Sequence, residues 1–288
     1  MGTIKGHLSL LLSTVFFASS ILCMSEVMTF IPNFKINALR FIIGGMLLIG
    51  VSRGIPFKCL DSKTYVYSLL RGCFGVAGYY LLETAALNYI SAPMVSILVC
   101  FCFIVELMYS MFSERRIYYQ TLSALICTLV GMLLICISEV KQISLYKVSY
   151  GVLLMVLASI SWVVYVHLEK TRSSQLTIAQ NVGLEMLLGG VCILPFALRE
   201  QPIAWLGLPI ATYIQVVYLA VFPSALAYLL YNKGSQKVTT KICTLYMNLL
   251  PVISIVLITI IKRDIPVVSQ CIGMILVTSS LMVVSLNE

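Results

Sequence analysis

The stretch Arg40-Phe-Ile-Ile-Gly44-Gly45-Met-Leu-Leu decides the fold of this chain, because a similar stretch occurs in the second half. Its counterpart is Glu185-Met-Leu-Leu-Gly189-Gly190-Val-Cys-Ile, 145 residues later. A second pair, Ala77-Gly-Tyr-Tyr80-Leu-Leu and Ala225-Leu-Ala-Tyr228-Leu-Leu, has an offset of 148 residues, which a three-residue change in one loop explains. Self-similarity at a nearly fixed offset indicates a duplicated module. We therefore predict two repeats, residues 1–146 and 147–288.

The composition is that of an integral membrane protein. Of the 288 residues, 60% are hydrophobic and only 10% are charged, and the mean hydropathy is +1.01. A soluble domain of this composition would have too little polar surface to cover itself. The lipid bilayer is therefore the expected surrounding of almost the whole chain.

The apolar segments predict ten membrane-spanning helices. A spanning helix needs about 20 mostly apolar residues, and these segments are too long for strands and lack the alternation of a membrane barrel. Backbone groups in lipid must also be hydrogen-bonded within the segment, which favours helices. The predicted spans are Leu8–Phe30, Ile36–Val51, Val66–Leu87, Met94–Phe112, Thr121–Ser138, Gly151–Leu168, Ile178–Leu198, Ile210–Tyr231, Ile242–Ile261 and Val267–Leu286.

The loop charges predict the orientation of these helices. The N-terminus and the even-numbered connectors carry eleven Lys and Arg residues, against six in the other connectors. Positive loops stay on the cytoplasmic side, so we expect a multi-pass protein of the plasma (cytoplasmic) membrane with both termini cytoplasmic. The net charge of +8 is then mainly a topology signal. Because the positive residues are spread over short loops, they form no basic face that could bind a nucleic acid.

The number of spans in each repeat implies that the repeats are inverted. Five is odd, so the second copy enters the membrane upside down relative to the first. The predicted fold is an all-α integral membrane protein with two inverted five-helix repeats around a central cavity. Secondary transporters built this way bind substrate near the bilayer midplane, where the repeats meet.

Several short motifs follow one another along essentially the whole chain, namely Ile36–Phe41, Ala86-Leu87 with Ser91-Ala92, Ser113-Glu114-Arg115, Ser224–Gly234 with Thr239-Thr240, and Met247–Val252. In their order and spacing the chain resembles a known family, the EamA branch of the drug/metabolite transporter superfamily. The resemblance implies export or exchange of small polar metabolites, such as amino acids or related compounds. The cavity implied by the resemblance is lined chiefly by helices 1, 3, 4, 6, 8 and 9.

Three features depart from the family pattern. Phe17-Ala18 stands where relatives often carry a Trp-Gly pair, although Trp162 keeps the tryptophan in the second repeat. The proline of helix 4 is replaced near Cys102 or Phe103, whereas Pro251 is kept in helix 9, where it is expected to kink the helix. The residue matching Glu114 is Lys262. These departures leave the predicted fold intact and weaken the transfer of a substrate.

Ionisable residues inside the spans are the first functional candidates. A charge at the bilayer centre costs at least about 2.5 to 3.5 kcal/mol and therefore faces a cavity or a partner. Arg40 and Glu185 occupy equivalent positions and are expected to pair or to gate transport, with a neutralised structural pair or contacts with lipid headgroups as the alternative. Glu106, in a strongly apolar helix, is the candidate for proton coupling, with a hydrogen bond to neighbouring helices as the alternative. Glu83 either binds a substrate ammonium or reaches the interface.

Aromatic and amide side chains on the expected cavity helices are candidates for substrate contact. Rings stack on cationic or aromatic ligands, although packing and the interfacial belt are alternative roles. Asn248 precedes Pro251 by three residues and is placed to serve the backbone carbonyl that the proline leaves free, or a ligand. The predicted substrate-binding residues are Tyr79, Tyr80, Glu83, Trp162, Tyr165, Tyr228, Tyr246 and Asn248.

Other functional classes find little support in the sequence. His7 and His167 are the only histidines, and Cys100-X-Cys102 has the wrong spacing for a metal knuckle or a redox pair. We expect no metal, no cofactor and no enzymatic activity. The expected partners are a small-molecule substrate and the lipid bilayer, with protons as candidate coupling ion, in a monomer or homodimer. The alternatives are a non-catalytic scaffold or receptor, or a carrier of nucleotide-sugar-like or drug-like solutes.

Overall fold

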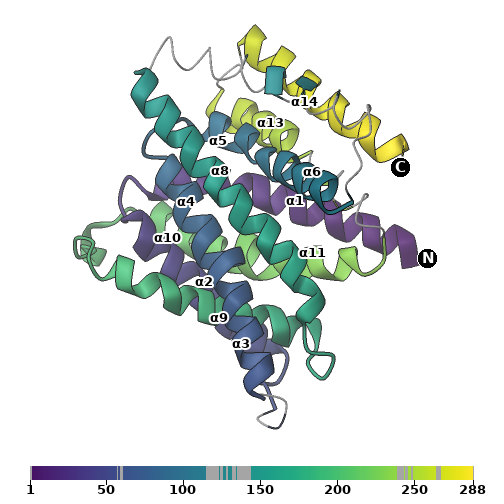
Figure 1. The fold of residues 1–288 in the computed structure, drawn as a ribbon. Helices are drawn as coiled ribbons and strands as arrows, with labels where there is room; N and C mark the ends of the chain where they lie inside the picture. The colour runs from purple at the N-terminus through teal and green to yellow at the C-terminus, as the bar shows by residue number, and fades with distance from the viewer. Residues whose placement is uncertain are drawn as a thin grey trace.

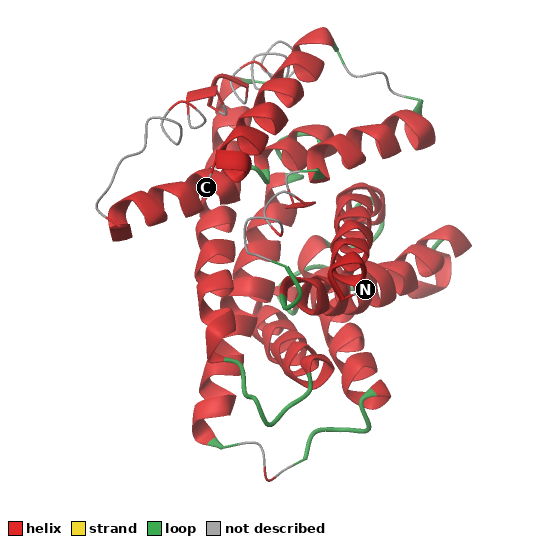
Figure 2. Ribbon diagram, turned by 90° about the vertical axis from the view of Figure 1, so that its right-hand side faces the viewer, coloured by secondary structure: helices red, strands yellow, loops and turns green. Residues whose placement is uncertain are grey.

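The structure is a computed structural model of residues 1–288, shown in Figure 1. It describes residues 2–56, 58, 61–114, 123, 126–127, 129–131, 134, 144–238, 243, 246–247, 249–263 and 267–287. These residues are almost entirely helical and contain no strand, as Figure 2 shows from a second direction. The predicted all-α fold is confirmed.

The helices of the first repeat are α1 (Gly2–Val27), α2 (Asn33–Val51), α3 (Ser62–Arg71), the π-helix η2 (Gly72–Gly78), α4 (Tyr79–Ala86), α5 (Ala92–Leu98) and α6 (Phe101–Glu114). Those of the second are α8 (Leu145–Leu168), the 3₁₀ helix η3 (Glu169–Thr171), α9 (Ile178–Ala197), the 3₁₀ helix η4 (Trp205–Gly207), α10 (Ile210–Leu219), the π-helix η5 (Ala220–Leu226), α11 (Ala227–Ser235), α13 (Leu250–Lys262) and α14 (Val268–Asn287). Most of the predicted fifth span, Thr121–Ser138, lies outside the described residues.

Five of the described helices are long and apolar enough to cross a membrane, namely Ile4–Val27, Asn33–Val51, Leu145–Leu168, Ile178–Ala197 and Ile210–Ser235. They correspond to the first, second, sixth, seventh and eighth predicted spans. Large apolar side chains such as Met46, Leu153 and Val217 remain exposed on their outer faces, as expected of surfaces that face lipid rather than water.

Local sequence explains where several helices begin. The Asp61 side chain accepts a hydrogen bond from the Thr64 backbone N–H at 2.9 Å and caps α3. Thr177 and Gln180 form a reciprocal capping box at the start of α9. Ser91 caps α5 through the Met94 N–H, with Pro93 in the first turn. These side chains satisfy backbone donors that have no partner within the helix.

The predicted third, fourth and eighth spans are interrupted, which the sequence reading did not foresee. In the third and eighth, the π-helices η2 and η5 lie between α-helical segments and are related by the same 148-residue offset as the repeated motif. Pro223 lies inside η5 and cannot donate a helical hydrogen bond. In the fourth, the chain turns at Val99-Cys100, where Cys102 N–H bonds to Val99 O at 2.9 Å. Such irregular backbone is often found at functional sites.

The two repeats pack against each other through equivalent helices. α2 and α9 form the most extensive contact, and α9 with η2 mirrors α2 with η5. Glycines allow this approach: a Cβ on Gly72 would lie 2.5 Å from Glu185 O, and one on Gly44 would lie 2.9 Å from Ala220 O. Small residues commonly permit such contact between membrane helices.

The direction of the helices fits an inverted duplication. Both ends of the chain lie on the same side of the bundle, at the right in Figure 1 and facing the viewer in Figure 2. α1 begins on that side, whereas its counterpart α8 runs towards it (Figure 1). Buried residues from both halves, including Phe41, Tyr80, Tyr165 and Tyr228, form one continuous core.

Candidate functional site

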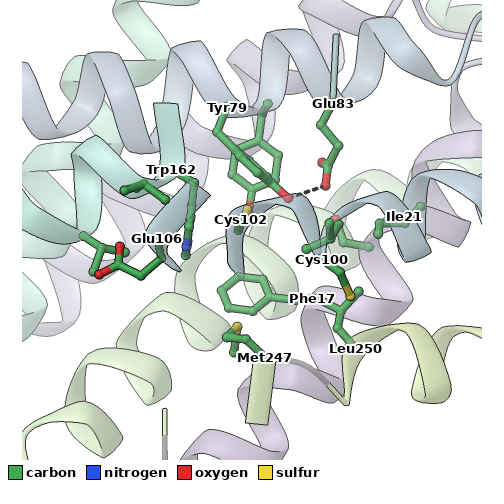
Figure 3. Close-up of a pocket in the computed structure, with 15 residues that line it drawn as sticks. Phe17, Ile21, Tyr79, Glu83, Cys100, Cys102, Glu106, Trp162, Met247 and Leu250 are labelled. Atoms are coloured by element: carbon green, nitrogen blue, oxygen red, sulfur yellow. Dashed lines mark hydrogen bonds between the residues drawn. The ribbon is translucent and has the colours of Figure 1, made fainter. Parts of the chain in front are cut away.

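A cavity lies where the two repeats meet. Its empty volume is about 910 Å³, including the part that is open to the outside. The residues that line it come from both repeats (Figure 3) and are Phe17, Ser20, Ile21, Tyr79, Tyr80, Glu83, Val99, Cys100, Cys102, Glu106, Trp162, Val163, Val166, Met247 and Leu250.

The interrupted helices bring backbone to the cavity wall. Val99 and Cys100 form the turn between α5 and α6, and Leu250 begins α13. Cys102 and Leu250 are equivalent positions at the 148-residue offset, so each repeat contributes the corresponding part of its fourth helix. Non-helical backbone at membrane depth is tolerated where it lines a cavity or is buried in protein.

Aromatic rings form one wall of the cavity. Trp162 lies 5.2 Å from Tyr79 and 6.5 Å from Phe17, measured between ring centroids. Phe17 and Trp162 are equivalent at the 145-residue offset, and the equivalent pair Tyr80 and Tyr228 is 6.4 Å apart. The pseudo-twofold axis therefore passes through this aromatic cluster, and its rings offer apolar faces to a bound molecule.

Two carboxylates line the cavity at separate places (Figure 3). Glu83, in α4, is only 5% exposed, and its Oε1 accepts a hydrogen bond from the Tyr79 hydroxyl at 3.0 Å. Glu106, in α6, lies on the other side of Trp162 from Glu83 (Figure 3), with its Oε1 3.7 Å from Nε2 of His167. No Lys or Arg is among the described residues that line the cavity.

A buried arginine lies directly behind the cavity wall. The Arg40 guanidinium is 4.5 Å from the centroid of the Tyr80 ring and 4.6 Å from that of Phe41, and Nη1 donates to Ser20 Oγ at 2.9 Å. Its Nε and Nη2 have no hydrogen-bond partner. Cation–π contacts thus compensate part of the burial of this charge, next to two residues that line the cavity.

Glu185 belongs to a buried ion cluster near the end of the bundle where α8 finishes. Its Oε1 is 2.7 Å from Arg71 Nε and its Oε2 is 3.0 Å from Arg172 Nη2. Arg172 also contacts Glu169 at 3.3 Å and bonds to Asn232. Burial raises the pKa of the Glu169 carboxyl, and the adjacent Arg172 acts in the opposite direction.

The structure therefore contradicts pairing between Arg40 and Glu185. The reason is geometric: a twofold axis in the membrane plane exchanges the two faces, so equivalent residues lie on opposite sides of the midplane. Arg40 faces Ser20 and Tyr80, whereas Glu185 faces Arg71 and Arg172. A gating role for either residue stays a prediction.

Comparison with known proteins places the chain in a family. The model of the EamA-like transporter family matches twice, over residues 4–137 and 149–286. The chain belongs to the EamA-like transporter family. Membership indicates a transporter rather than an enzyme, and a multi-pass membrane protein whose two repeats fit a ten-helix fold.

Individual relatives of this transporter are distant and cover most of its length. The uncharacterized transporter YyaM of Bacillus subtilis (strain 168) is 22% identical over 236 residues, which are 81% of this chain and 76% of the relative. An uncharacterized transporter of Archaeoglobus fulgidus is 24% identical over 255 residues, 87% of this chain and 88% of its own. A crystal structure of another protein has the same fold, with a TM-score of 0.70, 19% identity and coverage of 99% and 97% of the two chains.

Five of the predicted site residues of the transporter line the cavity, namely Tyr79, Tyr80, Glu83, Glu106 and Trp162. Tyr165 and Tyr228 are buried behind them, where Tyr165 accepts a hydrogen bond from Arg172 and Tyr228 donates one to Gly75 O. The Tyr246 hydroxyl is 3.1 Å from His7 Nδ1. Asn248 lies outside the described residues. Pro251 is the second residue of α13, where its missing N–H needs no partner.

Several residues of the transporter site were not among the predicted ones. Ser20, Cys100, Cys102 and Met247 line the cavity, as does Phe17, whose equivalence to Trp162 was the available signal. Arg71, Arg172 and His167 contribute the partners of Glu185 and Glu106. The sequence did not indicate that Arg71 pairs with Glu185 or His167 with Glu106, because the two members of each pair are distant in sequence. Within the described ranges, no group of three or more His, Cys, Asp or Glu side chains is arranged to hold a metal ion.

Proposed function

We propose that this protein is a secondary transporter that exports a small polar metabolite, an amino acid or a related compound, across the cytoplasmic membrane by alternating access. The observation that carries the proposal is the cavity between the repeats, where a buried carboxylate, Glu83, lies beside the aromatic wall. Two inverted repeats of similar structure can adopt inward-open and outward-open forms by exchanging conformations. The repeats are taken as residues 1–146 and 147–288, and both termini as cytoplasmic.

The chemistry of the cavity supports a ligand with an ammonium group. Glu83 supplies a negative oxygen, and Tyr79 and Trp162 supply ring faces to which a cation is attracted. Arg40 places a positive charge behind Ser20 and Tyr80 at the same end of the site. A zwitterion would be complementary to this arrangement, with its ammonium towards Glu83 and its carboxylate towards Ser20 and Arg40.

Protons are the proposed coupling ion, and Glu106 is the proposed carrier. Its carboxyl lines the cavity and can exchange a proton without leaving the transport path. The assembly is proposed to be a monomer or a homodimer, since the cavity is lined by residues of a single chain.

Ligand binding to purified protein tests the proposal. Thermal-shift measurements would compare amino acids, the corresponding amines and the corresponding carboxylic acids that lack the amine, because a ligand that binds only the folded state raises its apparent stability. We expect saturable stabilisation by compounds that carry the amine. In Glu83→Gln the apparent Kd should rise at least about tenfold, equivalent to about 1.4 kcal/mol.

The matched control is Glu26→Gln, which removes a carboxylate of α1 that bonds to Gln215 rather than lining the cavity. Its apparent Kd should stay within about twofold of wild type. Stabilisation by the amine-free acids alone, or equal Kd values in Glu83→Gln and wild type, would contradict the proposed substrate contact.

A further inference from the structure

The cavity carries a second acidic site whose partner the family resemblance does not assign. Glu106 on α6 and His167 in the last turn of α8 approach each other, with 3.7 Å between Oε1 and Nε2. The side chains are 37% and 31% exposed, whereas Glu83 is 5% exposed. The pair is therefore open enough to exchange a proton with water while one member lines the cavity.

The hydrogen bonding of His167 defines what its ring presents to Glu106. Nδ1 is 2.9 Å from the Val163 carbonyl oxygen. A carbonyl only accepts, so Nδ1 must carry a hydrogen. In the neutral ring Nε2 then has a bare lone pair, and that lone pair is on the side of the Glu106 carboxylate. Two acceptors facing each other repel, and a single proton on either atom converts the repulsion into attraction.

Other titratable groups surround the pair. Among the described side chains of the elements packed against α8, they are Tyr109 and Cys102 of α6, Tyr79, Tyr80 and Glu83 of α4, Cys73 of η2, Lys63, Tyr65, Tyr67 and Arg71 of α3, and Glu169 of η3, while α5 has none. Arg71 is paired with Glu185, and Glu169 with Arg172. The Tyr109 ring lies edge-on to the His167 ring with 4.3 Å between centroids, which fixes the ring orientation.

We propose that Glu106 and His167 form one proton-binding site, which takes up a single proton either on the carboxylate or on Nε2. The proposal rests on the proposed function, since it assigns the site at which a proton would be carried through the transport cycle. Proton uptake changes the charge of the pair from −1 to 0 and transfers no other atom. The cavity then holds a proton at one carboxylate and a substrate cation at the other.

Nuclear magnetic resonance tests the site without any transport assay, because the chain has only two histidines. Protein labelled with ¹⁵N-histidine would be titrated with pH in micelles, using His7→Gln to assign the signals. We expect the neutral His167 ring to carry its hydrogen on Nδ1 and to gain the second on Nε2. In Glu106→Gln an amide replaces the carboxylate that faces Nε2, so the ¹⁵N chemical shift of Nε2 should change while the His7 signals stay as in wild type.

Transport by variants separates this site from the proposed function. His167→Asn retains an amide N–H for the Val163 carbonyl but lacks Nε2, so it should fold. We expect net uptake of a radiolabelled amino-acid mixture driven by a pH gradient to fall about tenfold or more, and exchange of the labelled for the unlabelled mixture to stay within about twofold of wild type. His7→Gln, a histidine that bonds to Tyr246 instead, is the matched control and should resemble wild type in both.

The outcomes are distinct. A neutral ring protonated on Nε2, or an Nε2 chemical shift that is the same in Glu106→Gln and in wild type, would overturn the shared proton site. So would equal loss of net uptake and exchange in His167→Asn, or full retention of both. Absence of any flux in wild-type vesicles would instead refute the proposed function, and the titration would still decide whether the pair binds the proton.

Discussion

Single residues in this transporter show how buried charge is accommodated in a helical bundle. Glu185 is 1% exposed and compensates two arginines, Arg71 and Arg172. Arg40 is equally buried but relies on one hydroxyl and two ring faces. The first arrangement is balanced in charge once Glu169 is included, and it joins the two repeats, since Arg71 lies in one and Glu185 in the other. It is therefore expected to contribute to stability rather than to ligand binding.

We predict that Glu185→Gln destabilises the folded protein strongly. Removing one partner of a buried ion pair costs about 3 to 5 kcal/mol, because the remaining charges lose their compensation. Chemical denaturation in detergent would measure the loss, and Arg71→Met with Glu185→Leu in one chain should recover part of it. A single variant as stable as wild type would show that the cluster does not hold the repeats together.

Which residues pair could not be predicted from the sequence. The apolar context located Arg40, Glu83, Glu106 and Glu185 inside the spans, and three of them lie at or behind the cavity wall. The partner of Glu185, however, is 114 residues away in Arg71, and His167 lies 61 residues from Glu106. Such pairings depend on how the helices are rotated and packed, which a hydropathy pattern does not specify.

At the scale of helices, glycine and irregular backbone determine how the repeats meet. Gly72 begins η2 at the point where α9 crosses, and a Cβ there would lie 2.5 Å from Glu185 O and 2.7 Å from Gly189 N. Both neighbours are backbone atoms and cannot rotate away. The contact between η2 and α9 therefore requires the absence of a side chain.

Replacement of Gly72 by alanine should consequently separate these helices. We expect a loss of about 1 to 3 kcal/mol of unfolding free energy, typical of overpacking. The control is Gly50→Ala in α2, whose Cβ would have nothing within 4 Å and which should be neutral or more stable by up to about 1 kcal/mol through helix propensity. Equal stability of the two variants would argue against close packing of η2 on α9.

The sequence predicted most helices but not their interruptions. The long apolar spans could be predicted from the composition. The 148-residue offset showed which segments of the two repeats are equivalent. The turn at Val99-Cys100 could not be predicted, because neither Pro nor Gly occurs between Ile97 and Ile104. In the second repeat Pro251 did mark the corresponding region, where α13 begins.

For the molecule as a whole, duplication and inversion account for a cavity formed by both halves. The internal repeat and the odd number of spans predicted the arrangement, and the family match covers each half separately. The detailed lining could not be predicted, because it depends on the turn at Val99-Cys100 and on rotation of the aromatic side chains. The cavity contains the two carboxylates whose roles we propose, and the rest of its wall is mainly apolar.

Exchange across a membrane is the most direct test of the central claim that this cavity is a transport site. Proteoliposomes loaded with an unlabelled amine-bearing ligand identified by binding would receive the labelled compound outside. We predict saturable entry at least about tenfold above protein-free vesicles, with loss of that entry in Glu83→Gln and retention in Glu26→Gln. Entry equal to that of protein-free vesicles, for a ligand that demonstrably binds, would contradict transport through the cavity.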